Sequence, residues 1–106
     1  NIEKKPKVRI IRMRNALSID ETAINALRYT FNFCQKHGIR LILSGVHAQP
    51  LFALEKAGLL SEIGQGNICG NIDDALNVAR ESIGLPTLPR PADFAPTVKR
   101  EQIMGL

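Results

Sequence analysis

The feature that most limits the fold of this chain is an apolar segment of strand length followed, after a polar turn, by an amphipathic helix. The segment from Lys7 to Met13 is rich in β-branched and apolar side chains, which predicts a strand. The helix should run to about Lys36, with Gly38 as a typical left-handed stop. It is predicted from apolar residues that share one helical face through spacings of three and four: Ile24, Leu27, Phe31 and Cys34.

The start of this helix has two interpretations. Ser18 with Glu21 three residues later fits a capping box, whereas Asp20 could itself cap a helix that begins at Glu21. Either start places Thr22 in or near the first turn. The first N–H groups of a helix that follows a strand are exposed at the turn, where they can hold an anion or the carboxylate of a partner.

A second strand is predicted from Ile39 to Leu43, directly after the helix. Two strands separated by a helix of this length imply a right-handed crossover and a parallel pair. We therefore expect an α/β fold in which a small, mostly parallel or mixed sheet carries helices packed chiefly on one face.

The later elements are shorter. A second helix should begin between Ala48 and Leu51 and end at Gly58, with Leu51, Leu54 and Ala57 facing inward. The polar, glycine-bearing segment 61–66 is typical of a loop, and residues 67–69 of a short third strand.

A third helix is predicted between Asn71, as its cap, and Gly84, as its stop. Its expected apolar stripe consists of Ile72, Leu76, Ala79 and Ile83. Four prolines then follow between residues 86 and 96, so no regular element should continue. The expected organisation is a basic lead-in over residues 1–6, an α/β domain over 7–84 and a Pro-rich extended tail over 85–106.

The basic character of the chain belongs to one arm. Of its net charge of +4, residues 1–14 hold six Lys/Arg against one Glu, while the remaining residues hold eight against nine Asp/Glu. Such an arm either discourages edge-to-edge strand pairing or lies near an anionic membrane surface. No nucleic-acid partner is expected, because the basic residues are not interleaved with aromatic ones.

No apolar run approaches the ~20 residues that span a bilayer. Cys34 and Cys69 lie in apolar patterns without CxxC spacing, which favours reduced core cysteines. With two histidines and no HxxxH or Cys/His cluster, no metal site and no cofactor are predicted.

Several ordered segments together resemble a known family. These are Val8 to Arg14, Ser18 to Ala26, Gly38 to Val46 and Leu54 to Leu60. The chain from about Lys7 to Gly84 is similar to the STAS domain, which sulfate transporters and anti-sigma factor antagonists share. It looks most like the C-terminal cytoplasmic domain of a bacterial SulP-family sulfate/anion transporter.

The family's turn has the form Asp-(Ser/Thr/Ala)-(Ser/Thr)-Gly, and Asp20-Glu21-Thr22-Ala23 occupies its place. Glu21 therefore stands where the family has a small residue, and Ala23 stands where it has glycine. The opening strands of the family, which precede the segment matching Val8 to Arg14, have no counterpart here.

The resemblance implies a non-catalytic regulatory and interaction domain at the cytoplasmic face of the inner membrane. The implied partners are the transmembrane part of the same transporter, a regulatory cytosolic protein and a second copy of the chain. One alternative is a free-standing partner switch like the anti-sigma factor antagonists, phosphorylated at Thr22. A second alternative is a small phosphate- or nucleotide-handling enzyme.

The candidate site follows from the expected parallel strands. Ligands of parallel α/β layers usually bind at the carboxyl ends of the strands, and neighbouring strands bring their end turns together. We therefore expect one partner- or anion-binding surface, with Thr22 as the phospho-acceptor of the switch alternative and no catalytic residue. The surface would consist of Asp20, Glu21, Thr22, Ser44, Gly45 and His47.

Overall fold

The computed structural model describes residues 7–89, so the basic lead-in and residues 90–106 of the tail lie outside it. The first half of the described chain forms a strand, a helix and a second strand: β1 (Val8–Arg12), α1 (Glu21–Lys36) and β2 (Arg40–Ser44). Each lies within a residue of its predicted position. Then follow α2 (Ala48–Lys56), α3 (Leu59–Ile63), the 3-10 turn η1 (Gln65–Asn67), β3 (Ile68–Cys69) and α4 (Ile72–Ser82).

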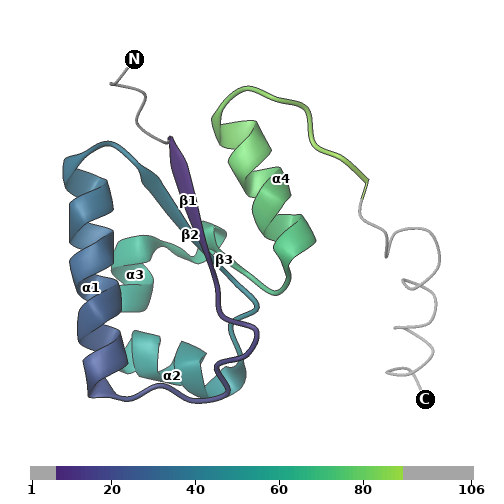
Figure 1. The fold of residues 1–106 in the computed structure, drawn as a ribbon. Helices are drawn as coiled ribbons and strands as arrows, with labels where there is room; N and C mark the ends of the chain where they lie inside the picture. Colours follow the sequence, from purple (N-terminus) through teal and green to yellow (C-terminus); the bar gives the residue numbers. More distant parts are fainter. Residues whose placement is uncertain (1–6, 90–106) are drawn as a thin grey trace, which may run out of the picture.

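The strands within residues 7–89 form one parallel sheet in the order β1-β2-β3. Val8 pairs with Arg40 and Arg12 with Ser44, so β1 and β2 end side by side. Helices α1, α2 and α3 cover one face of the sheet and α4 lies on the other (Figure 1). The predicted α/β class, with helices chiefly on one face, is confirmed.

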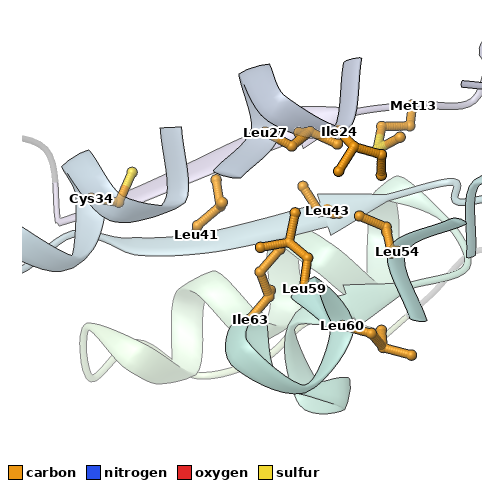
Figure 2. Packing of buried hydrophobic residues seen from close by; sticks show 10 residues of the cluster. All are labelled: Met13, Ile24, Leu27, Cys34, Leu41, Leu43, Leu54, Leu59, Leu60 and Ile63. Carbon is orange, nitrogen blue, oxygen red and sulfur yellow. The ribbon is translucent and has the colours of Figure 1, made fainter. Parts of the chain in front are cut away.

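The main core lies between β2 and the three helices of the first face. Leu41 and Leu43 of β2 both point toward that face. There they pack with Ile24 and Leu27 of α1 and with Leu59 of α3 (Figure 2). Ile42 points the opposite way and packs with Cys69 and Ala75 beneath α4. The central strand is therefore buried on both faces, as its apolar run predicts.

The predicted loop over residues 61–66 is wrong. Leu59, Leu60 and Ile63 are buried together, and this contact holds a short helix, α3, against β2. Gly58, with a positive φ of 77°, ends α2 and turns the chain into α3 at once. Polar Ser61 and Glu62 face outward, which explains why this segment looks like a loop in the sequence.

The inward faces of two helices also differ from expectation. Leu54 of α2 is buried, but Leu51, one turn earlier, is 38% exposed. In α4 the buried residue is Ala75, whereas Leu76 and Ile83 are exposed. Ile72 and Ala79 of the predicted stripe do pack against the sheet, so the stripe is right in part, and the face that packs is centred on the small Ala75 rather than on Leu76.

Candidate functional site

The first predicted turn is organised by Asp20. Its carboxylate accepts a hydrogen bond from the Ala23 N–H at 3.0 Å, which makes Asp20 the N-cap of α1 and decides between the two predicted starts. The turn is tied to α2 as well, because the Ile19 N–H donates to the Gln49 side chain at 2.8 Å. Thr22 lies exposed in the first turn of α1.

A groove of about 600 Å³ runs between α1 and α2 from this turn. We call it the α1–α2 groove; its lining includes Ile19, Asp20, Glu21, Ile24, Asn25, Arg28, Gln49, Phe52, Ala53, Lys56 and Ala57. Its acidic end is formed by Asp20 and Glu21, and its basic end by Arg28 and Lys56.

The basic end of the α1–α2 groove is held in place by several contacts. Arg28 donates to the Ala57 carbonyl at 2.9 Å and forms an ion pair with Glu62 at 3.4 Å. The Lys56 ammonium lies 5.9 Å from the centre of the Phe52 ring, within cation–π range. Phe52 is nevertheless 61% exposed, so a large apolar surface stands at the rim of the groove.

The second predicted turn packs against the end of β1. Gly45 has a positive φ of 69°, and a Cβ at this position would lie 3.0 Å from the Arg14 Cβ. His47 precedes α2, and its Nε2 lies 2.6 Å from the Arg14 carbonyl oxygen. A carbonyl can only accept, so the contact requires a proton on Nε2. His47 therefore anchors the Arg14 backbone, and the missing side chain of Gly45 leaves room for it.

Ser44 and Gly45 open on a second, smaller hollow of about 140 Å³ at the carboxyl ends of the strands. We call it the strand-end pocket; it is lined by Arg12, Arg14, Ser44, Gly45, Gly70, Asn71 and Ile72. It lies on the side of the sheet that α4 covers, because Ser44 alternates with Leu43 along β2.

The predicted surface is therefore divided between two hollows. Asp20 and Glu21 line the α1–α2 groove, whereas Ser44 and Gly45 line the strand-end pocket. His47 contacts the Arg14 backbone behind that pocket. Thr22 lines neither hollow, although it adjoins the groove in sequence.

Other residues of these hollows were not predicted. Asn71 lies two residues after the end of β3, so the rule that ligands bind at the carboxyl ends of parallel strands, which selected Ser44, also applies to it. Arg12 was assigned only to the basic arm, and its place beside Ser44 depends on the strand register. Nothing in the residue pattern marks Phe52 and Lys56, because their role depends on how α2 packs against α1.

The two cysteines of residues 7–89 are poor nucleophiles. Burial raises the pKa of the Cys34 thiol, an effect that Arg9 opposes. Burial, and then the charge of Asp74, raise the pKa of Cys69 against the opposing effect of Arg40. Both thiols are free and buried, and a raised pKa keeps them in the protonated form that is a poor nucleophile.

Residues 7–89 contain no cluster of three or more His, Cys, Asp or Glu side chains suited to a metal ion. In the same part of the chain, no helix has both the length and the apolar character needed to cross a membrane.

Comparison with known proteins gives consistent matches. The family model described as "STAS domain" matches residues 1–75. A curated relative, the putative sulfate transporter YvdB of Bacillus subtilis (strain 168), is 30% identical over 74 residues, which cover 70% of this chain and 14% of that protein. This chain therefore spans about one-seventh of the length of that relative.

Two solved structures share the fold. A sulfate transporter family protein from Wolinella succinogenes superposes with a TM-score of 0.73 at 37% identity, covering 76% of this chain and 66% of that one. The SulP transporter STAS domain from Vibrio cholerae superposes with a TM-score of 0.70 at 28% identity, covering 76% of this chain and 62% of that one.

Proposed function

The chain belongs to the STAS domain family, and from that premise we propose that it is a non-catalytic regulatory and interaction domain of a SulP-type sulfate/anion transporter. The three similar proteins named above are a putative sulfate transporter, a sulfate transporter family protein and a SulP transporter STAS domain, which supports the transport context. On this proposal the domain lies at the cytoplasmic face of the inner membrane and its partner is the transmembrane part of the same transporter.

The observation that carries the proposal is the α1–α2 groove. Its lining includes the apolar residues Ile24 and Ala53, with acidic residues at one end and basic residues at the other. Such a surface suits the docking of a polypeptide better than the catalysis of a reaction. The exposed Phe52 ring would supply the aromatic anchor that such interfaces commonly use. Thr22 adds an exposed hydroxyl beside the groove that a kinase could reach.

A paired substitution in the full-length transporter tests the proposal. Phe52→Ala removes the ring at the rim of the groove, and Tyr29→Ala removes a ring that is 74% exposed elsewhere on α1. We expect Phe52→Ala to change sulfate uptake by reconstituted transporter several-fold, because the few aromatic hot spots of an interface contribute about 2 kcal/mol or more each. Tyr29→Ala should leave uptake unchanged.

Equal uptake by the wild type and the Phe52→Ala variant, at equal expression, would contradict docking through the groove. A regulatory cytosolic protein and a second copy of the chain are the other partners that this surface could serve. Cross-linking from a cysteine introduced at Lys56 distinguishes the three partners by the mass of the product. A product with the mass of one transporter chain identifies the transmembrane part, and a product with twice that mass identifies a second copy.

A further inference from the structure

The strand-end pocket combines positive charge with hydrogen-bond donors. Arg12 and Ser44 are register partners on β1 and β2, so their side chains lie next to each other on the face that α4 covers. Arg14 follows at the end of β1, held by its contacts with Gly45 and His47. The charged side chains that line the pocket are these two arginines.

Ser44 gives the second indication of a ligand. The residue is only 2% exposed and lines the pocket, yet its hydroxyl has no hydrogen-bond partner among residues 7–89. Among residues 7–89 no fully buried side-chain nitrogen or oxygen lacks a hydrogen-bond partner, so the Ser44 hydroxyl must open on the pocket. The hydroxyl thus offers an unused donor and acceptor inside a cationic pocket.

The start of α4 supplies backbone donors at the same place. Asn71 caps the helix by accepting from the Asp74 N–H at 2.8 Å. The N–H groups of Ile72 and Asp73 are in the first turn, where a helix provides them with no acceptor, and Ile72 lines the pocket. N–H groups in this position favour an anion.

We infer that the strand-end pocket binds a small tetrahedral oxyanion, namely inorganic sulfate or phosphate. Arginine guanidinium groups, a hydroxyl and helix N–H groups together match the acceptor oxygens of such an ion. A volume of about 140 Å³ is well below the ~300–1,000 Å³ of sites for larger ligands, which disfavours a nucleotide. This site lies across the sheet from the α1–α2 groove and does not depend on the proposed docking.

Two carboxylates next to the pocket set the strength of this site. Asp73 and Asp74 are in the first turn of α4 but do not line the pocket, and the Asp74 carboxylate accepts from the Asn71 amide at 3.2 Å. Their negative charge opposes an anion, so binding should be weak and should respond to their removal. Asp73→Asn is therefore expected to tighten binding several-fold.

Titration of the ¹⁵N-labelled 106-residue chain with sodium sulfate and, separately, sodium phosphate tests the site, at constant ionic strength set with sodium chloride. We expect saturable shifts in the amide resonances of Gly45 and of residues 70–73. Arg12→Gln should weaken binding roughly tenfold or more, as expected for loss of a charge-assisted hydrogen bond. Saturation by only one of the two salts would identify the ion.

Arg9→Gln is the matched control, because it removes the same charge from the same strand on the opposite face of the sheet. It should leave the affinity unchanged, and well-dispersed spectra will show that each variant is folded. Equal weakening by both arginine substitutions, or shifts that never saturate, would reveal diffuse electrostatic attraction and overturn the inference. Unchanged affinity in Asp73→Asn would also overturn it.

Discussion

The two faces of the sheet are covered very differently. On one face α1, α2 and α3 bury a continuous cluster that includes Leu41, Leu54 and Leu59. Among the helices of residues 7–89, only α4 covers Ile42 and Cys69 on the other face, and its buried residue is the small Ala75. Figure 1 shows the contrast between α4 on one side of the strands and the three helices on the other.

This difference should make the two faces unequal in stability. The three-helix face buries more large apolar side chains, so it should supply most of the free energy of folding. The α4 face is held by fewer and smaller contacts, so α4 should open more readily than the rest of the fold. Each face carries one candidate site: the α1–α2 groove lies on the stable side and the strand-end pocket lies on the other.

The largest expected effect tests the three-helix face. Leu54→Ala removes a fully buried side chain and should lower the free energy of unfolding by ~2–5 kcal/mol. Leu51→Ala, one turn earlier in α2, removes the same atoms from a position that is 38% exposed and should cost less, about 1 kcal/mol. Urea unfolding of both variants, followed by circular dichroism, gives the comparison. Similar losses would mean that α2 packs with a different face.

A smaller effect is expected from overpacking the α4 face. Ala75 is fully buried against the sheet, so Ala75→Leu should push α4 outward at a cost of ~1–3 kcal/mol. Hydrogen exchange of the α4 amides should accelerate far more than exchange in α1. Leu76→Ala, an exposed neighbour, serves as control and should change neither rate. Equal acceleration in α1 and α4 would show that the two faces unfold as one unit.

The sequence predicted the elements whose formation depends on local pattern. The strand, helix and strand from residue 8 to residue 44 were predicted within a residue, because their apolar periodicity and glycine stop agree. Helix α3 was missed because a single turn depends on burial of its leucines against β2 rather than on local pattern. The exposure of Leu76 and Ile83 was missed because the packed face of α4 is centred on the small Ala75, which a search for large apolar residues does not mark.

The same distinction applies to the candidate site. The rule that ligands bind at the ends of parallel strands led to Ser44 and Gly45, which do open on a hollow. The rule did not show that Ser44 and Gly45 line a different hollow from Asp20 and Glu21. Which face of the sheet a residue lines depends on the direction of its side chain at the end of the strand. Side chains alternate along β2, so Ser44 points to the same face as Ile42, toward α4, and the all-apolar run does not show which of its two alternating sets faces α1.

The smallest expected effect concerns the cap that shapes the α1–α2 groove. Asp20→Ala removes the acceptor of the Ala23 N–H and should lower stability by ~0.5–2 kcal/mol. Ser18→Ala is the matched control and should lower stability less than Asp20→Ala. If Ser18 capped the helix instead, Ser18→Ala would lower stability more. Thermal unfolding measures both losses, and amide exchange at the first turn of α1 locates them. A larger loss in Ser18→Ala would move the start of α1 and, with it, the acidic end of the groove.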